Sequence, residues 1–340
     1  MIPGPYLVYL GSVTDKLAAK TARGIAYWRP GAAVGEAAEP DCPVSVGLPR
    51  MSAAEAAAIG ARTAVLGMTN AGGVMDPTSV AFCVEAIRAG LNVASGLHAR
   101  LSANSEIRAA AQAAGVSLFD VREPPADLPI GTGKLRAGNR LLTVGTDCAV
   151  GKMYTTLAIE RELRRRHIPA DFRATGQTGI LIAGSGVPID AVIADFIAGA
   201  AEWLTPPRDD DGWDLIEGQG SLFNPAYAGV SLGLLHGAQA DALILCHEAG
   251  RQTIRHAPNH AIPPLALCLE RNLEAARLTN PGVIAVGVAI NSSTLSPEEA
   301  RRYCAAVEDE LGLPCQDPVA MGVGRIADRL LACFAPSTHA

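Results

Sequence analysis

A segment in the middle of the chain, Gly145 to Lys152 with the sequence GTDCAVGK, follows the pattern of a phosphate-binding P-loop. In such a loop, glycines let the main chain wrap around phosphate oxygens, N–H groups at a helix N-terminus point at the anion, and the lysine adds a mobile positive charge. The pattern has the required context, because an apolar strand is expected at Leu141–Val144 and a helix from the loop through Arg166. The residues expected to bind a phosphate-bearing cofactor are Gly145, Thr146, Asp147, Cys148, Ala149, Val150, Gly151, Lys152 and Met153.

The residue after the lysine departs from the general P-loop rule. Position 153 is methionine, where a serine or threonine hydroxyl normally binds Mg²⁺. Thr155 and Thr156 point elsewhere around the helix, so neither simply replaces that hydroxyl. The missing metal ligand weakens the case for ATP hydrolysis and favours a ligand whose phosphates serve only as a handle, such as coenzyme A.

A second signal is the apolar run Trp213–Ile216, which ends in Glu217 and the glycine-containing segment Gly218–Gly220. In P-loop proteins an acid at the carboxyl edge of the sheet faces the phosphates, although a turn or helix-capping carboxylate gives the same pattern. Asp190 is a further acid, and we expect it to be the N-cap of a helix that begins at Val192.

Strands that alternate with helices predict parallel sheets with right-handed crossovers. Asp76 and Pro77 predict a helix start, and Ser296 begins a capping box for a last helix that reaches Leu311. The other expected strands are Tyr6–Leu10, Thr63–Met68, Leu91–Ser95, Val116–Asp120, Asp171–Ala174, Ala242–Cys246 and Val283–Ile290.

Residues 123–139 interrupt this alternation with three prolines and three glycines. The chain length of 340 residues also suggests about two domains. We therefore expect an α/β domain over residues 1–125, a linker over 126–139 and a P-loop domain over 140–340.

Composition excludes several classes of function. The net charge of −6 gives no attraction to nucleic acid or to an anionic membrane, and no apolar run reaches the ~18 residues of a membrane span. The eight cysteines show no Cys-x-x-Cys pair, and the first residues do not resemble a signal peptide. These features predict a cytoplasmic protein with reduced thiols and no metal site.

Taken together, these motifs are similar to a known family. The P-loop and Glu217–Gly220 resemble dethiobiotin synthetase, and nearly the whole chain resembles the D-glutamate N-acetyltransferases, which combine a Rossmann-like N-terminal domain with a P-loop domain. The segments that carry the second resemblance are Lys20–Gly24, Ser95–His98, the P-loop, Thr175–Gly179 and Glu217–Gly220. In that group a non-hydroxyl residue after the lysine is typical.

This resemblance implies acetyl transfer from acetyl-CoA to the amino group of D-glutamate, in a site between the two domains. The reaction needs a general base for the amine, donors for the thioester oxygen, and cations for the substrate carboxylates. The candidate catalytic residues are His98, His247 and Glu217. The candidate substrate-binding residues are Lys20, Thr21, Gly72, Gly73, Arg122 and Arg173, and Asn291 is a candidate for contact with the adenine ring.

Each of these residues also has an ordinary structural interpretation, such as a hydrogen-bonded histidine, a turn or an exposed charge. Arg251 and Arg255 are alternative carboxylate partners, with exposed helix charges as their ordinary interpretation. Two other functions stay open. One is an ATP- and Mg²⁺-dependent ligase or kinase of the dethiobiotin synthetase type, with Asp147 and Glu217 as carboxylates. The other is a non-enzymatic nucleotide switch. A homo-oligomer is the ordinary expectation for such enzymes.

Overall fold

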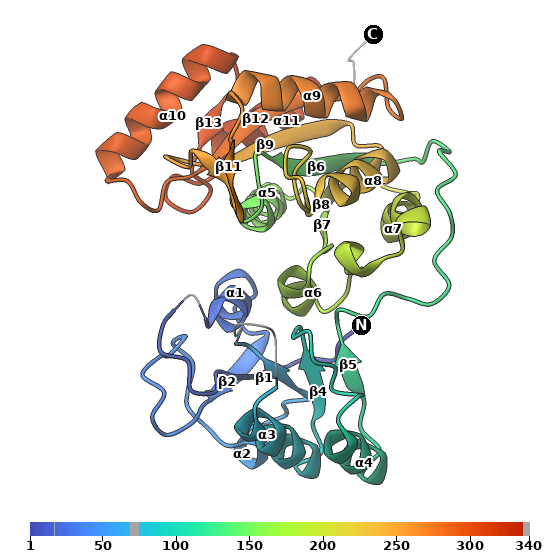
Figure 1. Ribbon diagram of the computed structural model, residues 1–340, viewed down its shortest axis with the longest axis vertical. Coiled ribbons are helices and arrows are strands. Elements are labelled where there is room, and N and C mark those ends of the chain that lie inside the picture. The colour runs from blue at the N-terminus through green and yellow to red at the C-terminus, as the bar shows by residue number, and fades with distance from the viewer. Residues whose placement is uncertain (17, 69–74, 336–340) are drawn as a thin grey trace. The chain divides into compact units, whose positions relative to one another are not determined.

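The computed structural model describes residues 1–16, 18–68 and 75–335 (Figure 1). The chain forms two compact units. Unit 1 contains Met1–Pro124 and Gly176–Ala191, and unit 2 contains Pro125–Thr175 and Val192–Ala340. The chain therefore leaves unit 2 after Thr175, contributes a second segment to unit 1, and returns to unit 2 at Val192.

Unit 1 contains a five-stranded parallel sheet in the order β2-β1-β3-β4-β5. All residues of β1 and β3 are buried, which explains why these strands read as continuous apolar runs rather than as alternating patterns. The strands are β1 (Tyr6–Tyr9), β2 (Ala33–Ala37), β3 (Thr63–Leu66), β4 (Asn92–Ser95) and β5 (Leu118–Asp120).

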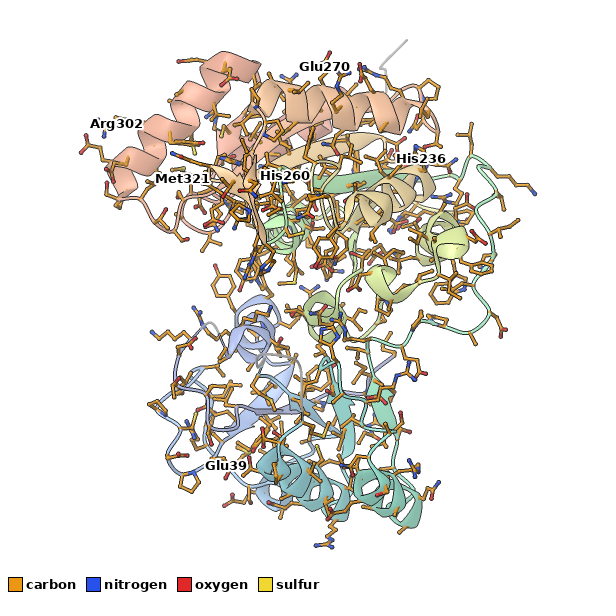
Figure 2. All side chains as sticks on the ribbon, in the orientation of Figure 1. Glu39, His236, His260, Glu270, Arg302 and Met321 are labelled. Carbon is orange, nitrogen blue, oxygen red and sulfur yellow. The ribbon has the colours of Figure 1, made fainter. Side chains whose placement is uncertain are left out.

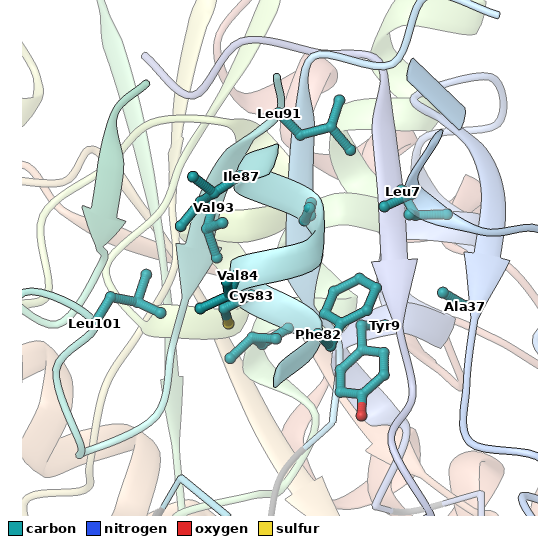
Figure 3. Packing of buried hydrophobic residues seen from close by; sticks show 14 of the residues in the cluster. Leu7, Tyr9, Ala37, Phe82, Cys83, Val84, Ile87, Leu91, Val93 and Leu101 are labelled. Carbon is teal, nitrogen blue, oxygen red and sulfur yellow. The ribbon is translucent and has the colours of Figure 1, made fainter. Parts of the chain in front are cut away.

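Helices cover both faces of this sheet, with α1 and α6 on one face and α2, α3 and α4 on the other (Figure 1). On the second face the rings of Tyr9 and Phe82 stack with centroids 3.9 Å apart, within the buried cluster of Figure 3. The helices are α1 (Lys20–Trp28), α2 (Ala53–Ala58), α3 (Pro77–Arg88), α4 (Ser105–Ala114) and α6 (Gln177–Ala183). Helix α6 reaches unit 1 from the second segment, and it packs on α1 at Gly24, where an added Cβ would lie 2.8 Å from Ile182.

Unit 2 contains a six-stranded parallel sheet in the order β13-β12-β9-β6-β8-β7. The P-loop strand β6 lies between β8 and β9, so the loops that follow these three strands meet at the centre of the carboxyl edge. The strands are β6 (Asn139–Gly145), β7 (Ala170–Arg173), β8 (Trp213–Ile216), β9 (Ala242–Glu248), β12 (Ile284–Asn291) and β13 (Cys315–Gln316).

The helices of unit 2 pack in two groups, since α5 contacts α11 while α8 contacts both α7 and α9. An antiparallel hairpin of β10 (Thr253–Ile254) and β11 (Ala257–Ala261) follows β9. The helices are α5 (Lys152–Arg165), α7 (Ile197–Leu204), α8 (Ala228–Ala238), α9 (Leu265–Arg277), α10 (Pro297–Leu311) and α11 (Gly324–Cys333). None of the helices in the described part of the chain combines the length and apolar composition that a membrane crossing needs.

The proline- and glycine-rich segment before β6 is fixed to unit 2 by hydrogen bonds. The Glu202 carboxylate of α7 accepts the backbone N–H groups of Thr132 and Gly133 at 2.8 to 2.9 Å. Arg136 donates to the Thr205 carbonyl at 2.9 Å and to the Gln239 side chain at 2.8 Å. This segment is therefore a strap along α7 and the end of α8.

Several local predictions are confirmed by the structure. Asp76 caps α3 by accepting the Ser79 N–H at 2.8 Å, and Ser296 and Glu299 form the capping box of α10. Each expected strand is present to within two residues at either end. The expected cap at Asp190 is wrong, because Asp190 lies in a 3-10 turn (Ile189–Ala191) and its carboxylate accepts from Arg122 at 3.1 Å.

Other elements carry no clear sequence signal. The strand β2 and the hairpin β10–β11 were not expected, and the ordinary interpretation of Arg251 and Arg255 was that of exposed helix charges. The helix interpretation is wrong, because Arg251 follows β9 in a turn and Arg255 lies between the two hairpin strands. Short strands of two to five residues contain too few positions for a period of two to stand out.

Gly199 of α7 provides a test of the strap. A Cβ at Gly199 would lie 1.8 Å from the Pro129 carbonyl oxygen, so we expect Gly199→Ala to displace the strap and lower the free energy of unfolding by about 1–3 kcal/mol. Gly229, on α8, is the matched control because a Cβ added there would have no neighbouring atom within 4 Å, and Gly229→Ala should raise stability by about 0.4–1 kcal/mol. Urea unfolding of both variants measures the difference, and equal stabilities would contradict the close packing.

Candidate phosphate-binding site

The predicted P-loop joins the end of β6 to the start of α5. Ala149 and Gly151 have φ values of 56° and 100°, so the loop turns through the left-handed region twice. An alanine in this region costs roughly 1–2 kcal/mol and is found where the surrounding structure fixes the loop. The first N–H groups of α5 have no acceptor within the helix, and with the helix dipole they form a site for an anion.

The P-loop and the segment after β8 approach their neighbours too closely for a side chain at Gly145 or Gly218. A Cβ at Gly145 would lie 2.9 Å from Val150 Cγ2 and 3.0 Å from Lys152 Nζ. A Cβ at Gly218 would lie 1.7 Å from the Thr143 carbonyl oxygen, because the segment after β8 runs directly against β6. These close approaches explain Gly145 and Gly218, whereas Gly151 is favoured by its positive φ.

Lys152 places its ammonium group inside the loop. Its Nζ donates to the carbonyl oxygens of Asp147 at 2.7 Å and Gly220 at 2.8 Å, and the residue is 7% exposed. Burial lowers the pKa of this lysine. The ammonium thus links the P-loop to the segment after β8. An anion bound in the loop would lie next to this positive charge.

The threonines after Met153 are already hydrogen-bonded. Thr155 Oγ1 donates to the Gly151 carbonyl at 3.0 Å, and Thr156 Oγ1 donates to the Lys152 carbonyl at 2.9 Å. Both hydroxyl groups are thus engaged with the backbone of α5. Over residues 1–16, 18–68 and 75–335, no group of three or more His, Cys, Asp or Glu side chains could hold a metal ion.

Asp147 is the best-connected residue of the loop, and its side chain has no exposure. Its carboxylate accepts the Arg255 N–H at 2.6 Å, Arg251 Nη1 at 3.0 Å and Asn224 Nδ2 at 3.0 Å. Burial alone would raise the pKa of this carboxyl, but the hydrogen bonds from Arg255 and Asn224 outweigh burial and lower it. The ionised carboxylate therefore joins the loop to the hairpin and to the segment after β8.

Glu217 directs its buried carboxylate at the main chain beyond β7. Glu217 Oε2 accepts the Thr175 N–H at 2.9 Å, and the Glu217 carbonyl accepts Thr175 Oγ1 at 2.6 Å. Arg173, the last residue of β7, donates from Nε to Asp214 at 2.8 Å and has a side chain 27% exposed. A substrate carboxylate would have to compete with Asp214 for this guanidinium.

His247 lies at the end of β9 and supports the loop from the other side. Its Nδ1 is 2.9 Å from Thr146 Oγ1, its ring stacks near Tyr303, and it is 4% exposed. Burial, with a smaller effect of the nearby charge of Arg251, lowers its pKa to about 4. The imidazole is therefore neutral at pH 7 and helps to position the loop.

Asn291 ends β12 next to the loop, and its Cβ lies 3.8 Å from the point that a Cβ on Gly151 would occupy. Its side-chain oxygen accepts the Ser293 N–H at 3.2 Å, which forms an Asx turn. The structure thus brings Asn291, Glu217 and His247 to the loop that sequence analysis selected. Sequence reasoning missed Asn224, because an isolated asparagine in an irregular segment carries no pattern.

The remaining candidates lie in unit 1. Lys20 is exposed at the start of α1, and Thr21 Oγ1 lies 3.2 Å from Thr178 Oγ1 of α6. His98 is exposed just after β4, and Arg122 is paired with Asp190. Gly72 and Gly73 lie outside the described residues.

Unit 1 also has a pocket of about 620 Å³ at the carboxyl ends of β1 and β2. Its polar lining includes Glu39, which accepts the Tyr9 hydroxyl at 2.6 Å, and Glu85. Its cationic residue, Arg50, is already paired with the buried Glu36 at 2.9 Å. The charges left over are negative, so this pocket does not complement a dicarboxylate.

Two family models match the chain. Residues 129–327 match the P-loop domain of DUF1611, described as a domain of unknown function, and residues 32–124 match its Rossmann-like domain. The chain belongs to the DUF1611 family. The expected architecture, a Rossmann-like parallel-sheet domain followed by a P-loop domain, is thereby confirmed.

Named relatives of this DUF1611 chain extend the comparison over its whole length. A D-glutamate N-acetyltransferase from Pseudoalteromonas sp. is 48% identical over 97% of the chain and 99% of that protein. A D-glutamate N-acetyltransferase from Tritonibacter scottomollicae is 49% identical over 98% of the chain and all of that protein. A crystal structure of a DUF1611 family protein from Anabaena variabilis has a TM-score of 0.85 and 30% identity, and covers 97% of the chain and 100% of that protein. The resemblance to the D-glutamate N-acetyltransferases is thereby confirmed.

The buried His247 generates a prediction about pH. Its folded-state pKa of about 4 lies below the ordinary value of 6.5, so between these values the unfolded chain binds the proton first. The stability that His247 contributes is therefore complete above pH 6.5 and is lost as pH falls towards 4, with a slope of up to about 1.4 kcal/mol per pH unit. Urea unfolding from pH 7 to pH 4.5 should show a smaller loss for His247→Gln than for the wild type. His260→Gln, on an exposed hairpin residue, should keep the wild-type profile, and an NMR titration of His247 near 6.5 would contradict the assignment.

Proposed function

We propose that this member of the DUF1611 family transfers the acetyl group of acetyl-CoA to the amino group of D-glutamate, giving N-acetyl-D-glutamate. The observation that carries the proposal is the identity of 48% and 49% to two D-glutamate N-acetyltransferases over nearly the full length of all three chains. The two-domain family match and the intact P-loop are consistent with it.

The P-loop is the proposed binding site for the phosphates of acetyl-CoA. The residues fit such a group, because the loop presents the open N-terminus of a 14-residue helix and a buried ammonium within a cradle that a Cβ would fill. A phosphate would offer Lys152 a charged acceptor in place of the carbonyls of Asp147 and Gly220. Asn291 is the proposed contact for the adenine ring.

The same residues favour a ligand whose phosphates are bound but do not react, over a reaction that transfers a phosphoryl group. Met153 offers no hydroxyl, Thr155 and Thr156 bond to the helix backbone, and Glu217 holds Thr175. Asp147 is fully enclosed by its three donors. An ATP- and Mg²⁺-dependent reaction would lack the hydroxyl ligand that a P-loop usually supplies at position 153.

The transfer also needs a base for the substrate amine, and we propose His98. This imidazole is exposed and follows β4, whereas His247 is buried, has a pKa of about 4 and holds Thr146. At neutral pH a group with so low a pKa is a poor acceptor for the proton of an ammonium. His247 and Glu217 are therefore proposed as positioning residues for the P-loop and for Thr175.

The substrate carboxylates need cations, and Lys20, Arg122 and Arg173 stay proposed for this role, with Thr21 beside Lys20 on α1. Arg122 and Arg173 would each exchange a carboxylate partner for the substrate. We further propose a homo-oligomer that works in the cytoplasm on a small amino-acid substrate.

A thiol-release assay tests the function directly. The protein incubated with acetyl-CoA and D-glutamate should release free coenzyme A thiol. An excess of EDTA should leave the rate unchanged, because Met153 lacks the hydroxyl that normally binds Mg²⁺ in a P-loop. The matched reaction with Mg-ATP in place of acetyl-CoA should give no ADP. ADP formation, or a strict requirement for Mg²⁺, would favour the ligase or kinase instead.

Lys152 provides the sharpest test of the P-loop assignment. Lys152→Ala should weaken acetyl-CoA binding by about tenfold or more, since charge-assisted hydrogen bonds contribute about 1.5–3 kcal/mol. Lys134→Ala removes the same charge from an exposed position in the strap and should leave the affinity unchanged. Calorimetric titration with acetyl-CoA measures both variants, and equal affinities would remove the loop from the binding site.

A further inference from the structure

The turn after β9 and the hairpin that follows it are attached to the P-loop by three hydrogen bonds. Asp147 accepts the Arg255 N–H at 2.6 Å and Arg251 Nη1 at 3.0 Å, and Arg251 Nη1 also donates to the Cys148 carbonyl at 2.6 Å. Ile254 of β10 is 2% exposed and anchors the hairpin in unit 2. The main chain of Arg255 is therefore held within hydrogen-bonding distance of the loop.

Among the described residues, Lys152, Arg251 and Arg255 are basic groups near the loop, and the guanidinium of Arg255 has no protein partner there. Lys152 bonds to two carbonyls, and Arg251, 16% exposed, is bonded to Asp147 and paired with Glu248. Arg255 is exposed, and no hydrogen bond or ion pair within residues 1–16, 18–68 and 75–335 uses its side chain. The positive charge of Arg255 nevertheless acts on a residue of the loop, the Cys148 thiol. Burial raises the pKa of the Cys148 thiol, while the charges of Lys152, Arg255 and Arg251 act to lower it.

A single P-loop does not account for all the phosphates of coenzyme A. The molecule carries a diphosphate on the 5′ carbon of its ribose and a separate phosphate on the 3′ carbon. The helix N-terminus and Lys152 form a site for phosphates in the loop. A second anion on the same ribose needs a cation that lies beside the loop rather than in it, and arginine is well suited to bind phosphate through paired N–H groups.

We propose that Arg255 forms a subsite for the 3′-phosphate of acetyl-CoA, and that the hairpin β10–β11 thereby distinguishes coenzyme A from nucleotides without this phosphate. The inference rests on the proposed use of acetyl-CoA as the donor. The hydrogen bond from the Arg255 N–H to Asp147 fixes the main chain from which the Arg255 side chain extends. The buried carboxylate of Asp147 therefore helps to position the Arg255 guanidinium as well as the loop.

The test compares the binding of coenzyme A and 3′-dephospho-coenzyme A by calorimetry, in the wild type and in Arg255→Ala. The wild type should bind coenzyme A about tenfold more tightly than the dephospho form, equivalent to about 1.4 kcal/mol. Arg255→Ala should lose this preference by weakening coenzyme A alone. The substitution keeps the backbone N–H that Asp147 accepts, so thermal unfolding should stay close to that of the wild type.

Arg302→Ala is the matched control, because it removes an exposed arginine from α10. Figure 2 labels Arg302 on α10 and His260 on the hairpin, and the two lie on different elements. It should keep the full preference for coenzyme A. Three results would overturn the subsite: equal binding of both ligands by the wild type, equal weakening of both by Arg255→Ala, or no binding of either ligand. Turnover is measured separately with D-glutamate. Intact ligand discrimination without thiol release would refute the proposed transfer and leave the subsite standing.

Discussion

The carboxylate of Asp147 lies at the start of the P-loop without contact with solvent. The geometry of the surrounding site depends on the donors that hydrogen-bond to this carboxylate. A buried carboxylate that loses its partners destabilises a fold by about 3–5 kcal/mol. Its donors come from two stretches that are distant in sequence, Asn224 after β8 and Arg251 and Arg255 after β9. The loop, the segment after β8 and the hairpin are consequently held as one body. An anion-binding loop that is already shaped loses less conformational entropy when its ligand arrives.

The buried polar groups around the loop divide into those that shape it and those that stay available. Glu217 accepts the Thr175 N–H beyond β7, His247 of β9 is bonded to Thr146 in the loop, and Thr156 of α5 is bonded to Thr143 of β6. What stays open towards solvent is a helix N-terminus with basic residues around it. Such an environment favours anions and offers little to a divalent cation, in keeping with the methionine at position 153.

Much of this architecture could be predicted from the residues alone, and the reason is physical. Buried parallel strands are apolar over their whole length, caps need particular side chains, and a P-loop needs glycine where a Cβ would clash, as at Gly145. The contacts that complete the site had no such signature. Asn224 is an isolated polar residue, the hairpin strands are short, and Asp190 had a plausible local role until Arg122, distant in sequence, proved to be its partner. Local rules place single residues well, whereas partners far apart in the chain are fixed only by the fold.

The second segment of unit 1 has a consequence for how the protein can be divided. Residues 176–191 belong to unit 1 although they follow the P-loop strand and helix of unit 2 in the chain. A gene fragment that ends near residue 124 would encode the five strands but not α6, and the surface of α1 around Gly24 would lose the helix that covers it. An isolated unit 1 would therefore need both of its segments, joined after residue 124.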